Sequence, residues 1–200
     1  AMEYVDGSDL AQWVTTHRPD LRRRIVLFLR VCDAVAFAHR SLIVHRDLKP
    51  ANVLVDAHDE PKLLDFGIAK LVEDDTEVQT RTVAAGLTLR YAAPEQVLGD
   101  RTTTATDVYA LGVVLFELIA RRSPYRAADA AETPWRDAIL RGDVHELGEA
   151  LDDALLDTND ARRVAQELAP VVRKAMALSP ADRYSGVAAM ADDLQDWLDG

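Results

Sequence analysis

Residues 45–52, which read HRDLKPAN, place three different polar side chains in one short run. Asp47 supplies a carboxylate, Lys49 an ammonium group and Asn52 a carboxamide. Transfer of a phosphoryl group needs an oriented nucleophile and neutralised charge, with little covalent chemistry from the protein. Asp47 could accept the proton of a hydroxyl group, while Lys49 could balance negative charge on the phosphoryl oxygens. The run therefore predicts a site for phosphoryl transfer.

Two further motifs follow at fixed distances along the chain. Asp65-Phe66-Gly67 begins thirteen residues after Asn52, and Ala93-Pro94-Glu95 ends thirty residues after Asp65. Asn52 offers a neutral oxygen and Asp65 an anionic one, and both are hard ligands that suit Mg²⁺. An isolated aspartate or asparagine in a loop is usually a turn former, but the order and spacing match the catalytic-loop, metal-loop and activation-segment signatures of protein kinases. The chain therefore resembles a bacterial Ser/Thr protein kinase of the eukaryotic (Hanks) type.

The first third of the chain is expected to form two helices and a hairpin. Ser8 can cap a short helix over residues 9–16, and Asp20 can start a longer one. Residues 53–55 and 62–64 are short apolar strands joined by a polar turn. The longer helix carries an apolar face at helical spacing, made of Leu21, Ile25, Phe28, Cys32 and Val35.

The rest of the chain is expected to be helical around one buried helix. Residues 73–90 are polar and rich in threonine, without a helical period, and predict a loop. Residues 106–120 are apolar nearly all round, which is typical of a helix inside a core. Ser185 can cap a last helix that Gly200 closes. Three more helical segments are expected, one of them broken or started by Pro170: residues 134–141, 148–156 and 160–178.

These elements resemble the large C-terminal lobe of a protein kinase, a mainly α fold with helices around a central buried helix and a small β-hairpin. The resemblance divides the chain into a hinge, a catalytic loop, an activation segment, a central helix and a last helix: residues 1–9, 43–56, 65–95, 106–120 and 185–199. It also implies an ATP site, with Met2 as gatekeeper, the hinge backbone at Glu3 and Val5 on adenine, and other contacts from Asp9, Lys49, Asn52, Leu54 and Asp65.

The resemblance implies regulation by phosphorylation. An arginine directly before the catalytic aspartate, here Arg46, is typical of kinases whose activation-loop phosphate orders the site, because a guanidinium binds phosphate through two hydrogen bonds. Thr80 and Thr82 look like the autophosphorylation pair of bacterial kinases. Thr88 aligns with the substrate-facing threonine of Ser/Thr-specific kinases. Leu87 interrupts the usual Gly-Thr pair there, which leaves the role of Thr88 open.

Five positions are assigned structural roles by the resemblance: His45, Phe66, Glu95, Asp107 and Arg183. Histidine often serves as a catalytic base, but His45 is expected to pack near Phe66. Glu95 is expected to be buried and paired with Arg183, because a guanidinium meets a carboxylate with two hydrogen bonds.

Composition limits the kind of partner. The chain has 23 basic and 34 acidic residues and a net charge of −11, which argues against a nucleic-acid surface. Its single cysteine, Cys32, excludes an internal disulfide and is expected to be a buried, inert thiol. No run approaches the roughly 18 apolar residues of a membrane helix. We therefore expect a cytoplasmic segment without membrane contact, in a parent that could be anchored elsewhere.

The chain has no Gly-x-Gly-x-x-Gly, and the strand lysine and helix glutamate of kinases belong to a lobe that precedes the hinge. The expectation is a Ser/Thr kinase lobe that is inactive alone, with protein hydroxyls, ATP and Mg²⁺ as partners and the face of the absent lobe as a candidate dimer surface. The alternative is a pseudokinase or binding module without catalysis. A third reading, a small-molecule kinase of the aminoglycoside-phosphotransferase type, lacks the threonine-bearing segment that ends at Glu95.

Overall fold

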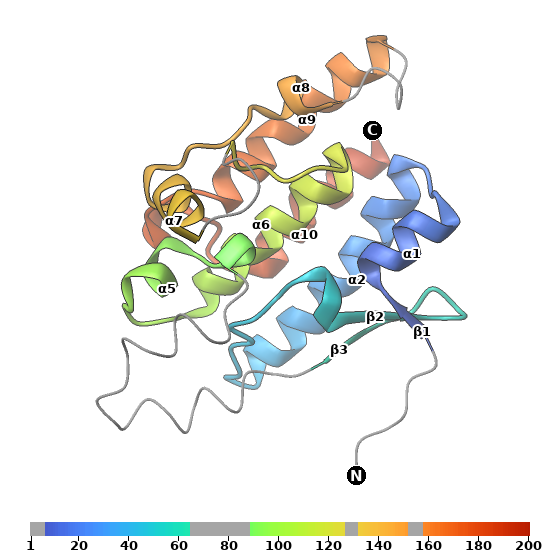
Figure 1. Cartoon of the computed structure of the whole chain (residues 1–200). Helices are drawn as coiled ribbons and strands as arrows, with labels where there is room; N and C mark the ends of the chain where they lie inside the picture. The colour runs from blue at the N-terminus through green and yellow to red at the C-terminus, as the bar shows by residue number, and fades with distance from the viewer. Residues whose placement is uncertain (1–6, 65–88, 127–131, 152–157) are drawn as a thin grey trace.

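A computed structural model of the chain describes residues 7–64, 89–126, 132–151 and 158–200 (Figure 1). Short 3₁₀ turns at Pro50–Asn52, Leu89–Tyr91 and Pro180–Asp182 connect the main elements. The strands are β1 (Gly7–Asp9), β2 (Val53–Asp56) and β3 (Pro61–Leu63). The helices are α1 (Leu10–His17), α2 (Leu21–Arg40), α5 (Pro94–Leu98), α6 (Thr104–Ala120), α7 (Glu132–Arg141), α8 (Leu147–Ala150), α9 (Thr158–Ala175) and α10 (Val187–Asp199).

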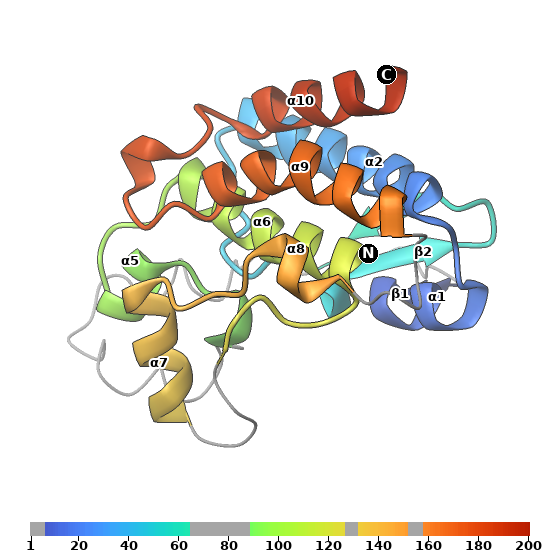
Figure 2. The ribbon, with the colours of Figure 1, turned by 90° about the horizontal axis from the view of Figure 1, so that it is seen from above.

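Helix α6 forms the centre of the core, as its apolar sequence predicts. From Thr106 to Phe116 every residue of α6 is buried. Helices α2 and α9 pack directly on α6, and α10 packs on α2 and α9, so the helices form layers on one side of α6 (Figure 2). Burial all round explains why α6 shows no amphipathic stripe. No helix in the described ranges has both the length and the apolar character needed to cross a membrane.

Helix α2 also follows its sequence pattern. Asp20 caps it, with the carboxylate accepting a hydrogen bond of 2.7 Å from the backbone N–H of Arg23. All five residues of the predicted apolar face are buried, and Cys32 is 1% exposed. Burial raises the pKa of the Cys32 thiol well above its ordinary value, and the nearby charge of Asp33 adds to this shift. The predicted burial of this thiol is therefore confirmed, and its raised pKa fits the expected low reactivity.

The predicted hairpin is present, but it belongs to a three-stranded antiparallel sheet. Strand β2 pairs with β3 on one side and with β1 on the other. Strand β1 was not predicted, because three residues are too few to show a period of two. Gly7 permits the pairing, since a Cβ there would lie 2.5 Å from the carbonyl oxygen of Val55. The sheet holds residues 7–9 beside the end of the catalytic loop.

Both serine caps were predicted wrongly. Ser8 lies in β1, and the helix after it is capped by Asp9, whose carboxylate accepts a hydrogen bond of 2.9 Å from the N–H of Gln12. The last helix begins after Gly186, which has no side chain to cap it, and not after Ser185. Each error is one residue, because neighbouring Ser, Asp and Gly compete for the same position. Gly200 ends α10, as predicted.

Helix α9 runs through Pro170, contrary to the prediction that proline would break or start a helix. An interior proline removes one hydrogen bond and costs roughly 3 kcal/mol. Burial of apolar residues before and after it offsets this cost, since Leu168, Val171 and Val172 are all buried. Of the predicted helix 148–156, the structure contains α8, which ends at Ala150. Most of the predicted loop 73–90 lies outside the described residues, and the remainder begins a 3₁₀ turn at Leu89.

Candidate active site

The three polar side chains of the HRDLKPAN run converge in the structure. The ammonium Nζ of Lys49 lies 2.9 Å from Oδ2 of Asp47. The amide Nδ2 of Asn52 donates to the same oxygen at 3.0 Å and to the backbone carbonyl of Asp47 at 2.8 Å. A tight turn, closed by a 2.9 Å hydrogen bond from the N–H of Asn52 to the carbonyl of Lys49, brings the side chains to one side of the loop. One carboxylate is thus held beside a cation and an amide.

The carboxamide of Asn52 has a fixed orientation that suits a hard cation. Its Nδ2 is engaged twice by Asp47, which leaves Oδ1 as the atom available to a metal. Asn52 is 9% exposed, so the surrounding side chains hold this orientation. A neutral oxygen fits Mg²⁺, which prefers oxygen ligands. The second predicted ligand, Asp65, lies outside the described residues. Among the described residues, no group of three or more His, Cys, Asp or Glu side chains could hold a metal ion.

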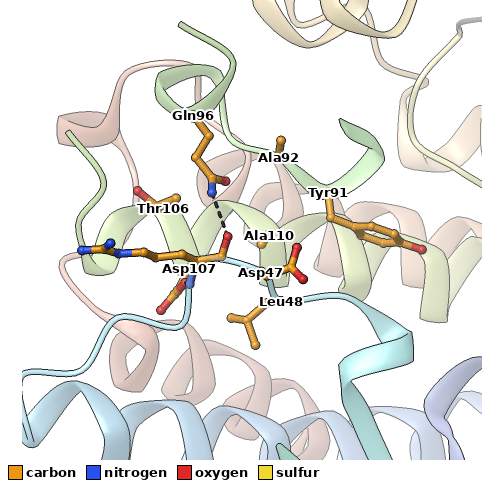
Figure 3. Close-up of a pocket in the computed structure, with 9 residues that line it drawn as sticks. Asp47, Leu48, Tyr91, Ala92, Gln96, Thr106, Asp107 and Ala110 are labelled. Atoms are coloured by element: carbon orange, nitrogen blue, oxygen red, sulfur yellow. Dashed lines mark hydrogen bonds between the residues drawn. The ribbon is translucent and has the colours of Figure 1, made fainter. Parts of the chain in front are cut away.

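The residue before Asp47 has an unusual backbone that two distant side chains hold. Arg46 has φ +68°, in the left-handed region that costs a non-glycine residue free energy. Its N–H donates to Oδ1 of Asp107 at 2.8 Å, and its carbonyl accepts from Nε2 of Gln96 at 2.8 Å. Figure 3 shows Gln96 and Asp107 on either side of this loop. Because both backbone groups are bound, the strained turn persists, and it orients Asp47.

Asp107 anchors the loop that carries His45, Arg46 and Asp47 to the core. It lies in the first turn of α6 and is 1% exposed. Its Oδ2 accepts from the N–H of His45 at 2.8 Å and lies 2.7 Å from Nε2 of His39. Together with the bond to Arg46, three contacts satisfy this buried carboxylate, and the helix N-terminus favours its negative charge. The loop is therefore mounted on the most buried helix.

His45 has a structural position, as predicted. Its side chain is buried, Nε2 donates to the carbonyl of Leu64 at 2.9 Å, and Nδ1 accepts a long hydrogen bond of 3.4 Å from the N–H of Asp47. This pattern uses one nitrogen as donor and the other as acceptor, which fits a neutral ring. The ring links the catalytic loop to the chain leaving β3. Its expected partner, Phe66, lies outside the described residues.

Besides Lys49 and Asn52, two predicted nucleotide positions lie opposite each other on neighbouring strands. Asp9 of β1 and Leu54 of β2 are partners in the antiparallel register. Asp9 uses Oδ1 to accept the capping hydrogen bond of α1, and a carboxylate has further lone pairs that could accept from a ribose hydroxyl. Leu54 is half-buried. Seven further predicted positions on nucleotide, phosphate and substrate lie outside the described residues: Met2, Glu3, Val5, Asp65, Thr80, Thr82 and Thr88.

The predicted pair of Glu95 and Arg183 is present and buried. Nη1 and Nη2 of Arg183 donate to the two oxygens of Glu95 at 2.7 and 2.8 Å. The side chains are 0% and 8% exposed for Arg183 and Glu95. The hydroxyl of Thr106 donates to Glu95 at 2.8 Å. The pair joins α5 to the turn before α10, 88 residues later in the chain.

Acid should weaken this pair. Burial alone would raise the pKa of Glu95, but hydrogen bonds from Arg183 and Thr106 hold it below its ordinary value. The pair's contribution is therefore complete above the unfolded-state pKa of about 4.3 and is lost as pH falls through the lower folded-state pKa. Urea unfolding should show the largest stability gap between the natural protein and Glu95→Gln above about pH 5, and a shrinking gap below it. A gap independent of pH would contradict this assignment.

Sequence reasoning missed two residues of the site. Gln96 is one of them, since its Nε2 holds Arg46 while its Oε1 accepts from the N–H of Ala93 at 3.0 Å. A glutamine after a Pro-Glu pair carries no signal for a partner fifty residues away. His39 is the other, in contact with Asp107. It lies in a helix whose pattern is dominated by apolar residues, so nothing in the sequence marks it.

Comparison with known proteins shows which family this chain belongs to. Residues 1–195 match the family described as Protein kinase domain. A protein of Mycobacterium leprae named Serine/threonine-protein kinase PknB is 34% identical over 194 residues, which are 96% of this chain and 29% of that relative. PknB of Mycolicibacterium smegmatis is 36% identical with the same coverage. The Probable serine/threonine-protein kinase CE0033 of Corynebacterium efficiens is 36% identical over 97% of this chain and 28% of its own length. The chain thus spans less than a third of these relatives.

Proposed function

The chain belongs to the protein kinase family, and from this premise we propose that it supplies the catalytic residues for transfer of the γ-phosphate of ATP to Ser or Thr hydroxyls of proteins. The observation that carries the proposal is the convergence of Lys49 and Asn52 on Oδ2 of Asp47, at 2.9 and 3.0 Å. In a reaction that depends on positioning and charge neutralisation, this arrangement provides both.

Each residue has a distinct task in this proposal. Asp47 accepts the proton of the substrate hydroxyl and orients its oxygen towards phosphorus. Lys49 balances charge on the phosphoryl oxygens. Asn52, through Oδ1, and Asp65 would hold Mg²⁺, and this ion would supply positive charge to offset that of the ATP phosphates. Asp107 and Gln96 are positioning residues, because they act only through the backbone of the catalytic loop.

Regulation and domain organisation extend the proposal. We assign the chain to the larger lobe of a kinase, with residues 1–9 as the hinge, residues 65–95 as the activation segment, and Asp9 and Leu54 beside the nucleotide. Phosphate on Thr80 or Thr82 would give Arg46 an anion and order the segment, and Thr88 would face the substrate. The helical layers around α6 and the fixed loop backbone support this assignment.

Phosphate transfer by the full-length protein that contains this chain tests the proposal. Labelled ATP, Mg²⁺ and a mixed Ser/Thr protein acceptor should give labelled phosphoserine or phosphothreonine. The matched control is Asp47→Asn, which keeps the shape of the side chain. Absence of transfer, combined with retained nucleotide binding, would favour a pseudokinase instead.

Residues 1–200 expressed alone should bind ATP weakly and transfer phosphate only at background level. They contain no glycine-rich loop and no lysine from a second lobe to hold the phosphates, so half of the expected contacts are lacking. Isothermal titration with ATP and Mg²⁺ should give a dissociation constant no tighter than roughly the millimolar range, about −4 kcal/mol. A micromolar constant, or robust turnover abolished by Asp47→Asn, would contradict this expectation.

A further inference from the structure

A cavity of about 210 Å³ is lined in part by Pro50, the residue that follows Lys49 in the chain. It is formed by α1, the 3₁₀ turn at Pro50 within the proposed catalytic loop, and the C-terminal end of α6. Its apolar wall includes Leu10, Val14, Pro50, Val114 and Leu118, and the rest of its lining is polar or charged. The function proposed above uses none of these residues.

The cavity is within reach of a substrate bound at Asp47. Pro50, which lines it, follows Asp47 by three residues, and three residues of chain span at most roughly 11 Å. Arg90, which also lines it, precedes Tyr91, and Tyr91 borders a small pocket beside Asp47 (Figure 3). An extended peptide whose hydroxyl lies at Asp47 would therefore reach the cavity with a side chain about three residues away.

Charged side chains at the cavity are mainly arginines. Arg90 lies 2.7 Å from Oε1 of Glu117, and the hydroxyl of Tyr91 donates to Oε2 of Glu117 at 2.8 Å. Both oxygens of this carboxylate are thus engaged, so it is a poor site for another cation. Arg121 and Arg122 complete the charged lining, and neither has a carboxylate within ion-pair distance among the described residues. In a chain with a net charge of −11, this is a local concentration of positive charge.

Among the described residues, Arg122 is hydrogen-bonded to a histidine and not to a carboxylate. Nη2 of Arg122 lies 3.0 Å from Nε2 of His145. Burial and the adjacent Arg122 and Arg126 hold the pKa of His145 below its ordinary value, so the ring is neutral at pH 7 and accepts this hydrogen bond. A planar guanidinium binds carboxylates through two parallel hydrogen bonds.

We propose that this cavity selects protein substrates that carry a glutamate or aspartate about three residues from the phosphorylated hydroxyl. The methylene groups of the acidic side chain would contact the apolar wall, while its carboxylate would bind Arg121 and Arg122. This inference rests on the proposed kinase function and deepens it, because it names the class of substrate.

The backbone of Arg121 provides a clean variant. Arg121 ends α6 with φ +57°, where glycine is the unstrained residue. Its N–H donates to the carbonyl of Glu117 at 2.8 Å, a hydrogen bond that glycine would keep. Arg121→Gly therefore removes the cation without adding backbone strain, and Arg122→Gln tests the neighbouring charge. Arg141→Gln is a matched control, since Arg141 is 78% exposed on α7 and does not line the cavity.

The experiment compares alanine-based peptides that contain one threonine. A single Glu, Gln or Lys is placed in turn at each of the four positions before and the four positions after this threonine. For the full-length kinase, kcat/KM should be about tenfold higher for the Glu peptide than for the Gln peptide at one position. A hydrogen bond to a charged group has an effect of this size. Arg121→Gly and Arg122→Gln should bring this ratio close to one, mainly through KM, with unchanged melting temperatures. Arg141→Gln should retain it.

Several results would overturn the inference while leaving the kinase function intact. These are a higher kcat/KM for the Lys peptide, the same gain from Glu at every position, or a Glu-to-Gln ratio of kcat/KM that Arg121→Gly does not change. If no acceptor is phosphorylated, the proposed function fails, and the cavity is then tested by binding alone. A fluorescein-labelled Glu peptide should bind the natural protein more tightly than its Gln counterpart, and Arg121→Gly should remove the difference. If millimolar inorganic phosphate competed equally well with the Glu peptide for binding, the cavity would be a general anion site instead.

Discussion

Arg183→Ala should lower the free energy of unfolding by roughly 3–5 kcal/mol, because it leaves the carboxylate of Glu95 buried without its cation. Arg183 uses all five of its N–H donors. Two of them bind Glu95, and the others donate to the carbonyls of Ala177, Ala105 and Leu178 at 2.8, 2.8 and 3.0 Å. The guanidinium also lies 4.9 Å from the ring centre of Tyr109. Its loss would free several buried acceptors at once.

A double-mutant cycle measures the pair itself. Glu95→Ala should also cost well over 1 kcal/mol, because it leaves a buried guanidinium partly unpaired. The double variant should lose much less than the sum of the single variants, since neither charge is then left without its partner. Arg183→Lys should fall between the natural protein and Arg183→Ala, because an ammonium group keeps the positive charge but cannot make two parallel hydrogen bonds to Glu95. Urea unfolding followed by circular dichroism gives all four values.

An exposed pair of the same chemistry serves as the control. Arg173 and Glu146 lie 3.0 Å apart, but their side chains are 69% and 63% exposed. Alanine at either should change stability by less than about 1 kcal/mol. If Glu95→Ala and Arg183→Ala gave equally small and additive effects, burial would not be what makes their pair important.

Periodicity in the sequence predicted the elements that form the core. Helix α2 repeats apolar residues along one face, and α6 is apolar on all faces. The first pattern is stable with that face against the core, and the second only inside the core. Both helices are present, the predicted face of α2 is buried, and α6 lies in the middle of the core as expected. The short elements behave differently. Strand β1 has three residues, and its pairing depends on β2, which lies more than forty residues away in the chain. Local sequence carries no information about that partner.

The same distinction applies to the site. Asp47, Lys49 and Asn52 lie within six positions, so a single turn brings them together and spacing alone predicted the cluster. The contact from Gln96 to Arg46 joins residues fifty apart, and packing of α5 against the loop creates it. The Glu95–Arg183 pair spans 88 residues and was expected only because the family resemblance supplied it. Long-range contacts are thus set by the fold and not by nearby sequence.

Asp47→Asn should lower kcat of the full-length protein by roughly 10²–10⁴-fold, the usual contribution of a general base. The substitution is nearly isosteric. A side-chain carbonyl in place of Oδ2 could still accept from Asn52 and Lys49, at the 3.0 and 2.9 Å seen for the carboxylate. Stability should therefore change by less than about 1 kcal/mol. What is lost is the basicity that takes the proton from the substrate hydroxyl.

Comparison with a second aspartate separates this role from a simple loss of charge. Asp143→Asn removes one negative charge from a side chain that is 57% exposed and only loosely paired with Arg126, at 3.6 Å. It should leave kcat within about twofold, because exposed charges are screened. Rapid quench of a single turnover shows whether Asp47→Asn slows the transfer step itself. If Asp47→Asn kept more than about a tenth of kcat, less than 1.4 kcal/mol of barrier would depend on this carboxylate. Proton removal would then have to be assigned to another group.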